Sequence, residues 1–514
     1  MCDQPILVVG AGPVGITAAA MLARFDVPVR IIDTAAAATT QSRALVVWRR
    51  TLEVLDPIVS RHRFLDSHPV VDAVTFSNGR RTFAQLSLRQ DGRAIPGGVF
   101  IPQSQTESLL LEGLASFGIE VERETSLVSL SESADGIEAV LQTPSGTESV
   151  STPWLVACDG GKSLVRRTLD LDFPGHTVSG NYVLADMVID RDDERLDVLH
   201  VNFAKQGTVV LFPIDQRLWR IFAVCDSLAE SRQSQAPTIA ELQQLIDTQT
   251  NRDWTIESVP WSTPYHVNER QIKQYVHGPI VLAGDAAHIH SPAGGQGMNI
   301  GIQDAANLAW KLALVAKGDS SPALMGTYQA ERHPIGKKVV RASSLMLGAI
   351  SKKNLFVRLM RRILLGLATR LPPIRKKMAS MLTEDVPTYR SGPLGGRRRP
   401  GATHGPGDFF PDLPLQISGT LSSATDLCRG RGGTILCFSE PTSTPPHRFG
   451  AGGRGLDLEV VDVDMTETQG GALLAKAFGL CEGGFVLVRP DCVIATAGEA
   501  MADIEDWMEI HLAS

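Results

Sequence analysis

The sequence predicts an α/β protein in which a Rossmann-like domain carries an inserted, mostly antiparallel β-sheet and precedes a further C-terminal domain. Three observations predict this fold. A GAGPVG turn at residues 10–15 stands between a short apolar strand and a helix. Residues 279–314 have the pattern of a buried strand, a polar turn, a glycine-rich loop and a helix. Residues 176–276 alternate apolar and polar side chains, as antiparallel strands covered on one face do.

The GAGPVG turn has the spacing of a dinucleotide-binding fingerprint. It follows the apolar strand 6–9, opens a helix that runs to about Arg24 and precedes a second short strand at 29–32. Gly10 permits the tight turn, Gly12 lets the backbone approach a pyrophosphate, and Gly15 lets helix and strand pack closely. Asp33 ends the second strand, where a carboxylate can accept ribose hydroxyls. These four residues together predict a dinucleotide site.

A second GxGxxG at residues 450–455 lacks this context. It follows a proline-rich stretch and precedes a strand at 456–463 instead of a helix. We therefore predict a loop there, because the fingerprint needs strand, turn and helix in that order.

The stretch 279–314 predicts a second part of the same site. Asp285 follows a buried strand and can accept sugar hydroxyls. Gly294, Gly295 and Gly297 would let backbone amides approach a flat ligand without side-chain obstruction. An ordinary strand–loop–helix connection would explain the Gly-Asp pair alone, but not the whole stretch.

A third strand-to-turn segment lies at 156–166, where Asp159 and Gly160 follow an apolar strand. By themselves these residues indicate a plain β-turn. Their combination with the two other motifs favours a nucleotide site.

The remaining elements of the first two thirds are predicted from alternation and turn residues. A hairpin over 71–88 turns at Asn78-Gly79, a helix covers 107–117, and two or three strands lie in 120–147. The inserted sheet has predicted strands at 182–189, 198–203, 208–213 and 218–225.

Composition excludes several classes of protein. The net charge of −7 gives no reason to expect nucleic acid as a partner. The seven cysteines are odd in number and form no CxxC pair, which indicates reduced thiols in the cytoplasm and no zinc site. No run of eighteen apolar residues predicts a membrane span, and no signal peptide is expected before the first strand. At 514 residues the chain should hold two to four domains.

With these motifs in place, the chain resembles the single-component FAD-dependent aromatic hydroxylases related to para-hydroxybenzoate hydroxylase and phenol hydroxylase. The resemblance is carried by GAGPVG, by ACDGGKSLVR at 157–166 and by LAGDAAHIHSPAGGQGMN at 282–299. The tyrosine, arginine and proline at 328–334 are similar to the pattern that follows in the family. The similarity covers residues 5–345 and is greatest to hydroxylases that tailor aromatic polyketides, such as those of angucycline pathways.

The resemblance implies FAD as cofactor. It places the pyrophosphate and adenosine along the N-terminal motifs, with Leu127 packed near the adenine and Asp159 and Gly160 serving both FAD and NAD(P)H. The residues implied on this side are Gly10, Gly12, Pro13, Val14, Gly15, Asp33, Thr34, Arg43, Gln103, Leu127, Asp159 and Gly160.

The resemblance also implies that the second glycine-rich stretch holds the ribityl chain and presents backbone groups to the isoalloxazine. The residues implied there are Gly284, Asp285, Pro292, Gly295, Gly297, Met298 and Asn299.

The chemistry implied by the family is reduction of FAD by NAD(P)H, reaction with O2 to a flavin C4a-hydroperoxide, and transfer of the distal oxygen to a phenolic or quinoid polycyclic substrate. No second nicotinamide domain is visible, so NAD(P)H would bind transiently, and no metal is needed. The catalytic base stays open among Tyr265, His266, His288 and His290, each of which is more simply explained by packing.

Two other functions stay open. Members with the same motifs can insert oxygen beside a ketone in a Baeyer–Villiger reaction. A flavin-binding scaffold without turnover is the alternative from a different class, although the intact glycines and Asp285 argue against it.

The C-terminal third begins with basic helices. Residues 333–382 hold no acidic residue, and 354–371 is predicted to be an amphipathic helix. The basic helix 352–377 could lie on a membrane surface, but a solvated basic face is the favoured interpretation. Residues 415–514 are similar to the thioredoxin-like domain of the family, without its CxxC, and favour a structural role or a homodimer contact.

The predicted domains follow from these assignments. The FAD-binding domain comprises 1–70, 97–175 and 277–345, and the substrate-binding sheet comprises 71–96 and 176–276. Linking helices occupy 346–390 and the thioredoxin-like domain occupies 391–514.

Overall fold

The computed structural model describes residues 4–512 except 41, 43, 80, 91, 135, 205–206, 226–235, 293, 352–354, 386–387, 418–419, 440–455, 466–469 and 481–482. The second GxGxxG at 450–455 and the side chain of Arg43 therefore lie outside the described residues. Among those described, no helix is both long and apolar enough to cross a bilayer.

The N-terminal body is built on a six-stranded sheet in which five strands run parallel to one another, and only β17 is antiparallel to its neighbour β18. Its strands are short and almost entirely apolar because both faces are covered. In order across the sheet they are β17 (Val276–His277), β18 (Ile280–Leu282), β11 (Leu155–Ala157), β1 (Ile6–Val9), β2 (Val29–Ile32) and β7 (Val121–Glu122).

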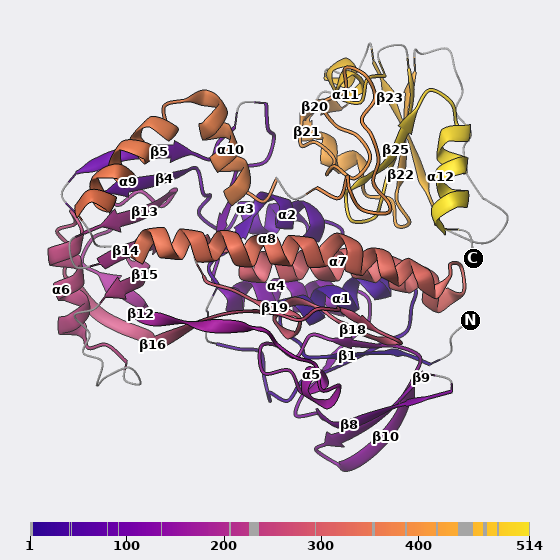
Figure 1. The fold of residues 1–514 in the computed structure, drawn as a ribbon, viewed down its shortest axis with the longest axis horizontal. Coiled ribbons are helices and arrows are strands. Elements are labelled where there is room, and N and C mark those ends of the chain that lie inside the picture. The colour runs from indigo at the N-terminus through magenta and orange to yellow at the C-terminus, as the bar shows by residue number, and fades with distance from the viewer. Residues whose placement is uncertain are drawn as a thin grey trace.

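Helices cover one face of this sheet and an antiparallel meander shares its core on the other side (Figure 1). The four main helices are α1 (Pro13–Arg24), α4 (Gln103–Ala115), α7 (Gly297–Lys317) and α8 (Met325–Ser351). The meander consists of β8 (Ser126–Ser133), β9 (Gly136–Thr143) and β10 (Gly146–Thr152). The shorter elements are α2 (Arg49–Leu55), α3 (Arg61–Leu65), α5 (Leu164–Thr168), the β3–β6 pair (Val46–Trp48, Gly98–Phe100) and 3₁₀ turns at Gly284–Ala286 and Pro322–Leu324.

An eight-stranded sheet forms the second body, at the left of Figure 1. All neighbours are antiparallel except β13 and β4. Helix α6 (Ile239–Gln249) packs on one face, and the other face turns toward the N-terminal body. The strands in order are β19 (His288–Ile289), β16 (Ile256–Gln271), β12 (Gly175–Ile189), β15 (Leu218–Cys225), β14 (Gly207–Pro213), β13 (Val198–Phe203), β4 (Ala73–Ser77) and β5 (Thr82–Ser87).

The predicted strands of this sheet and the hairpin at Asn78-Gly79 are present, but β16 was missed. It is a long strand that contains Pro260 and Pro264 and few apolar residues, so it lacks the alternation that identifies strands. The helix predicted at 107–117 begins four residues earlier, at Gln103, and the segment 120–147 contributes to four strands.

The amphipathic helix predicted over 354–371 is present with slightly shorter bounds, but the prediction of a single basic helix over 352–377 is wrong. The chain forms α9 (Leu355–Ala368) and α10 (Pro372–Leu382), separated by a short turn. Pro372 and Pro373 begin α10, and a residue before proline is driven out of the helical region, which ends the first helix.

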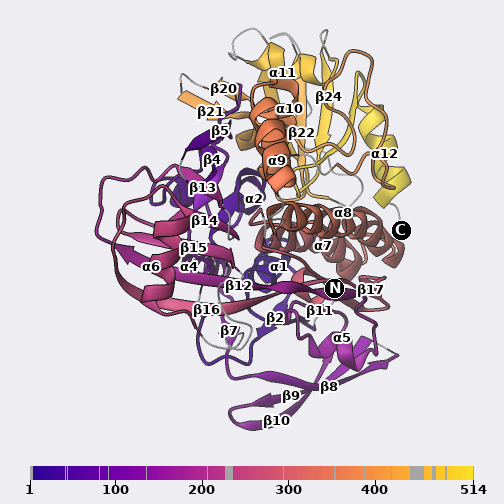
Figure 2. The same ribbon diagram turned by 60° about the vertical axis from the view of Figure 1, so that its left-hand side comes forward.

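The C-terminal domain contains a mixed four-stranded sheet in the order β23-β22-β24-β25, with β22 and β23 parallel (Figure 2). Its elements are a hairpin of β20 (Pro414–Ile417) and β21 (Thr420–Ser423), a 3₁₀ turn (Ala424–Leu427), β22 (Thr434–Ser439), β23 (Glu459–Asp464), α11 (Gly471–Ala477), β24 (Gly484–Val488), β25 (Ile494–Gly498) and α12 (Ala502–Leu512). Its likeness to thioredoxin and the domain boundaries stay predictions.

A buried charge cluster fastens this domain to the helices of the N-terminal body. Arg489 donates to Glu331 of α8 at 2.7 Å and to Asp491, and Lys311 of α7 donates to Glu331 at 2.7 Å. The side chains of Arg489, Glu331 and Lys311 are completely buried. Burial opposes ionisation of Glu331, but Arg489 and Lys311 hold its pKa well below the usual value. The carboxylate of Glu331 is therefore ionised, and it accepts hydrogen bonds from both Lys311 and Arg489.

Glu384, which follows α10, is a buried acid in a different state. Its Oε2 accepts hydrogen bonds from Gln303 Nε2 at 2.5 Å and Thr51 Oγ1 at 3.4 Å, and no cation pairs with it among the described contacts. Burial raises the pKa of Glu384 from 4.5 to about 8. The folded protein therefore keeps this carboxyl protonated at pH values where the unfolded chain loses the proton.

We expect Glu384→Gln to reduce the pH dependence of unfolding between about pH 5 and about pH 8. Wild-type stability should fall as pH rises through this window, by at most about 1.4 kcal/mol per pH unit for this group. Urea unfolding at several pH values measures the difference between the two proteins. Asp253→Asn, at an exposed side chain, is the control, and equal slopes for Glu384→Gln and wild type would contradict the argument.

Candidate active site

The predicted site residues gather at one edge of the parallel sheet. Gly10 follows β1, Asp33 follows β2, Asp159 follows β11 and Asp285 lies just beyond β18. These four strands are neighbours in the order β18-β11-β1-β2 and run in the same direction. Because the carboxyl ends of parallel strands meet at one edge, three motifs separated by more than a hundred residues form one site.

The protein requires glycine at positions 10 and 15 of the first turn, but not at position 12. Gly10 has a φ of +100°, and a Cβ there would lie 2.4 Å from the carbonyl oxygen of Cys158. A Cβ on Gly15 would lie 1.8 Å from the carbonyl oxygen of Gly10. Gly12 has an ordinary φ of −79°, and a Cβ there would meet nothing within 4 Å. The protein itself does not require glycine at position 12, which leaves space for a ligand at the N-terminus of α1.

Asp33 is held where β2 ends by backbone amides of the turn. Its Oδ2 accepts from Ala11 N at 2.7 Å and its Oδ1 from Ala35 N at 2.8 Å. Each oxygen keeps a further lone pair for a donor such as a sugar hydroxyl. Thr34, the next residue, is exposed. The backbone amide of Thr125 donates to Asp33 O, and Leu127, two residues further along, is buried.

Gln103 holds Ser42 and Ala44 in place. Gln103 N donates to Ser42 Oγ at 2.6 Å, and Gln103 Oε1 accepts from Ala44 N at 3.2 Å. From the sheet domain, Arg220 reaches Ala44 O at 3.4 Å while pairing with Asp186 at 2.7 and 2.8 Å. The residues on both sides of position 43 are thus held between the two bodies.

Asp159 caps the helix that follows it. Its Oδ2 accepts from Leu164 N at 2.7 Å and Val165 N at 3.2 Å, whereas its Oδ1 is buried with no protein partner. A buried acceptor without a partner is costly, so it indicates a place for a donor from outside the protein. Gly160 has a φ of +75° and open surroundings, so the backbone is accessible at this turn.

The second glycine-rich loop is braced against β3. Asn299 Nδ2 donates to Val46 O at 2.8 Å and to Gly295 O at 2.9 Å, and Asn299 Oδ1 accepts from Trp48 N at 2.9 Å. Gly295 N closes a turn onto Pro292 O at 2.9 Å. These hydrogen bonds hold Gly295 and the start of α7 against β3.

The two remaining glycines of this region pack against the first motif and a histidine. Gly284 has a φ of +58°, and a Cβ there would lie 2.8 Å from Val14. Gly297 begins α7 beside His290, with Met298 partly buried after it. Asp285 is exposed in the 3₁₀ turn at this edge.

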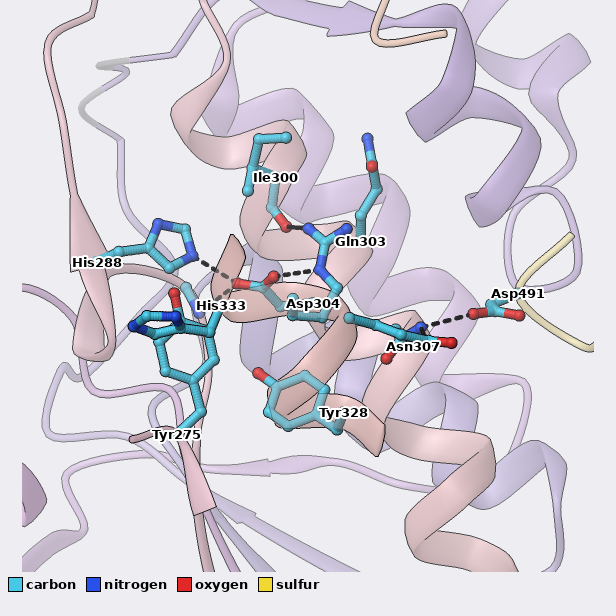
Figure 3. Close-up of polar contacts among 12 residues, drawn as sticks. Tyr275, His288, Ile300, Gln303, Asp304, Asn307, Tyr328, His333 and Asp491 are labelled. Atoms are coloured by element: carbon cyan, nitrogen blue, oxygen red, sulfur yellow. Dashed lines mark hydrogen bonds and ion pairs between the residues drawn. The ribbon is translucent and has the colours of Figure 1, made fainter. Parts of the chain in front are cut away.

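A buried network beneath the loop was not predicted from the sequence (Figure 3). Asp304 of α7 accepts from Arg332 Nε at 2.6 Å, pairs with His288 Nε2 at 2.7 Å and accepts from Gly284 N at 3.2 Å. Arg332 also donates to Ile300 O and to Tyr389 Oη. Burial opposes ionisation, but Arg332 and then His288 hold the pKa of Asp304 below its usual value.

This network positions the Gly284–Asp285 turn without touching the ligand space itself. The signal for it in the sequence is a lone acid on a helix that is buried from Asn299 to Leu314, because such an acid needs a buried cation. The tyrosine and arginine at 328 and 332 were noted as a family pattern. The structure gives them contacts: Tyr328 donates to Leu282 O at 2.9 Å, and Arg332 pairs with Asp304.

The candidate bases separate into two groups. His288 is paired with Asp304 and stacks on Tyr275, which is a packing role. His290 Nδ1 lies 2.9 Å from Ser291 O, and burial lowers the pKa of His290 to about 4, so this imidazole is neutral at neutral pH. The side chains of Tyr265 and His266 lie outside the described residues.

The residues present fit FAD. The open space over Gly12 faces the N-terminus of a twelve-residue helix, which favours a pyrophosphate. The carboxylate of Asp33 can accept further hydrogen bonds, and Oδ1 of Asp159 has no donor in the protein. The backbone of the loop at Gly295 could contact a planar ring. In the described part of the chain, His, Cys, Asp and Glu side chains form no group of three that could hold a metal ion.

Two surface grooves lie away from these motifs. One, of about 610 Å³, is lined by residues such as Glu132, Trp154 and Pro279, on the side where β11 and β18 begin. The other, of about 510 Å³, lies between α3 and α4 and includes His62 and His68. Neither contains a predicted cofactor residue, so the assignment of the site rests on the motif geometry.

Comparisons with known proteins identify the family of the chain. A family model described as an FAD binding domain matches residues 3–343. A 6-methylpretetramide 4-monooxygenase of Streptomyces rimosus is 31% identical over 97% of this chain and 91% of that protein. The structure of OxyS anhydrotetracycline hydroxylase from the same organism has a TM-score of 0.77 and 25% identity, and covers 99% of each chain. That of CabE, an aromatic hydroxylase from angucycline biosynthesis, has a TM-score of 0.74 and 26% identity, with the same coverage.

Proposed function

Because the chain belongs to the FAD-dependent aromatic monooxygenases, we propose that it uses NAD(P)H and O2 to hydroxylate a phenolic or quinoid polycyclic substrate of aromatic polyketide type. FAD is its cofactor, as the family resemblance predicted. The relatives are named monooxygenases, which favours an enzyme over a scaffold. The relatives' names include 6-methylpretetramide and anhydrotetracycline among the compounds acted on, and the proposal assigns compounds of this kind to this chain.

The observation that carries the proposal is the apolar cluster beside the flavin loop. Val46 and Trp48 lie against Gly295 and belong to the same buried cluster as aromatic residues of the eight-stranded sheet. Phe76 stacks on Phe203 with centroids 6.2 Å apart, and other aromatic members of the cluster are Tyr182, Phe222 and Phe100. These aromatic side chains are buried, and an aromatic-rich cluster next to the expected isoalloxazine is the environment that a flat, apolar ring system prefers.

When bound, FAD supplies the activation of O2, and the chain's own residues position it. The N-terminus of α1 and the space over Gly12 would hold the pyrophosphate, while Asp33 would accept from the adenosine ribose. Asp285 and the Gly295–Asn299 backbone would hold the ribityl chain and the ring. The apolar cluster would orient the substrate and exclude water, which protects a reactive oxygen species.

The proposal is tested by measuring whether a substrate accelerates the reduction of the bound flavin by NAD(P)H. The purified protein should show flavin absorbance, and anaerobic NADPH or NADH should bleach it faster in the presence of one of a panel of polycyclic phenols. The aerobic product should be a phenol with one added oxygen atom. Bound flavin that neither nucleotide bleaches, with or without phenols, would contradict the proposal, and an ester or lactone product would show oxygen insertion beside a ketone instead.

A further inference from the structure

Large apolar side chains gather at the surface of the linking helices. Of the fifteen large apolar side chains that are exposed in the described part of the chain, ten fall between residues 345 and 381. They are Leu345, Met346, Phe356, Leu359, Ile363, Leu364, Leu367, Leu371, Ile374 and Met381. Exposed apolar residues are normally scattered singly, so this concentration indicates an interaction surface. The eight residues from Phe356 to Met381, on α9, α10 and the turn between them, are here called the α9–α10 face.

Helix α9 is apolar on two sides. Its inner side packs on the sheet domain, where Leu365 joins the apolar cluster and Arg361 lies 3.9 Å over the ring of Phe203. Its outer side exposes Leu359, Ile363 and Leu367 at 53%, 44% and 51%. Spacings of four residues place these three on one stripe. Both α9 and α10 lie over β5, at the upper left of Figure 1, and the exposed fractions of the three side chains show that the stripe is accessible.

The same segment is strongly cationic in an acidic protein. Residues 333–382 contain twelve basic residues and no acidic one, although the whole chain has a net charge of −7. Those that the structure describes as exposed are Lys337, Lys338, Arg341, Arg362, Arg370, Arg375, Lys376 and Lys377. The occupant of this face must therefore be both apolar and anionic.

We propose that the α9–α10 face docks on an anionic lipid bilayer. The exposed leucine and isoleucine side chains enter the boundary of the acyl chains, and the basic side chains lie among the headgroup phosphates. A second copy of this chain is a poor occupant, because a two-fold contact would place these cations opposite one another. The rest of the acidic surface then faces away from the lipid, which fixes the orientation of docking.

Docking would bring the substrate side of the enzyme close to the lipid. Helix α9 packs on the aromatic cluster of the sheet through Leu365, so a bilayer at its outer stripe would lie one helix away from that cluster. This consequence rests on the proposed function, whereas the docking itself does not.

Vesicle co-sedimentation of the full chain with bound FAD tests the proposal. We expect the protein to sediment with phosphatidylcholine vesicles that contain phosphatidylglycerol, and not with phosphatidylcholine alone. Binding should weaken between about 0.1 M and about 1 M salt, as the Debye length falls from about 10 to about 3 Å. Arg362→Gln should weaken it about fivefold, the ratio that corresponds to about 1 kcal/mol per basic residue at an anionic surface.

The double variant Ile363→Glu/Leu367→Glu should lose binding by at least about tenfold, because it removes inserted apolar groups and adds charges that the lipid repels. Leu473→Glu/Ile510→Glu, at side chains 56% and 73% exposed on the C-terminal domain, is the matched control and should bind as wild type does. Unchanged FAD content and unfolding midpoint show that each variant is folded.

Absence of sedimentation with anionic vesicles, or equal loss in the control variant, would overturn the proposal. So would a wild-type dimer in analytical ultracentrifugation that Ile363→Glu/Leu367→Glu dissociates, since the face would then bind a second copy. Vesicle co-sedimentation needs no catalytic turnover, so the docking proposal is tested even if the proposed enzymatic function is wrong.

Discussion

Gly12→Val is expected to abolish tight FAD binding while leaving the protein folded, whereas Gly15→Ala is expected to prevent stable folding. At position 12 the backbone has an ordinary φ and a Cβ meets no protein atom, so the apoprotein accommodates a side chain. The valine would occupy the space proposed for the pyrophosphate. One charge-assisted hydrogen bond is worth about 1.5–3 kcal/mol, so the dissociation constant should rise about 10- to 100-fold or more.

At position 15 the added Cβ would lie 1.8 Å from Gly10 O, and neither backbone can move without separating α1 from β1. We expect the free energy of unfolding to fall by more than about 4 kcal/mol, a loss large enough to point to a single steric cause. FAD titration followed by fluorescence and urea unfolding followed by circular dichroism measure the two effects separately.

Gly326→Val is the control for both, because a Cβ at Gly326 in α8 also meets nothing within 4 Å but lies outside the predicted site. FAD affinity equal to wild type in Gly12→Val would show that the pyrophosphate does not lie at this turn. Wild-type stability of Gly15→Ala would contradict the close approach of helix and strand.

Asp304→Asn is expected to destabilise the protein by about 3–5 kcal/mol, the cost of leaving one member of a buried ion pair without its partner. All three groups that contact this carboxylate donate to it: Arg332 Nε, His288 Nε2 and Gly284 N. An asparagine amide would present its own N–H groups to at least one of these donors. The side chain of Arg332 is completely buried, so its charge has no access to water.

Because Asp304 also fixes the amide of Gly284, the same variant should bind FAD more weakly than its stability loss alone explains. Urea unfolding of the apoprotein gives the first effect, and FAD titration at low denaturant gives the second. Asp253→Asn, whose side chain is fully exposed, should change neither by more than about 0.5 kcal/mol. A loss below about 1 kcal/mol for Asp304→Asn would show that the network is not the support of the loop.

Sequence reasoning succeeded where structure is decided locally. The strands at β1 and β2, the helix α1 and the hairpin at Asn78-Gly79 were predicted at or close to their bounds. Their signals are apolar runs and turn residues within a few positions of each other. It failed at β16, whose prolines and polar residues hide a strand that is defined by its pairing with β12.

The sequence alone predicted a dinucleotide site, because glycines and acids suited to such a ligand act through the backbone beside them and so leave a fixed local spacing. The resemblance of the three motifs to a known family then implied the family and FAD, and the family model agrees with both. Which buried charges support that site was decided only by the tertiary structure. Arg332 lies 28 residues from Asp304, and Arg489 lies 158 residues from Glu331. No spacing rule connects such pairs, since burial and pairing of a charge depend on which distant segment folds against it.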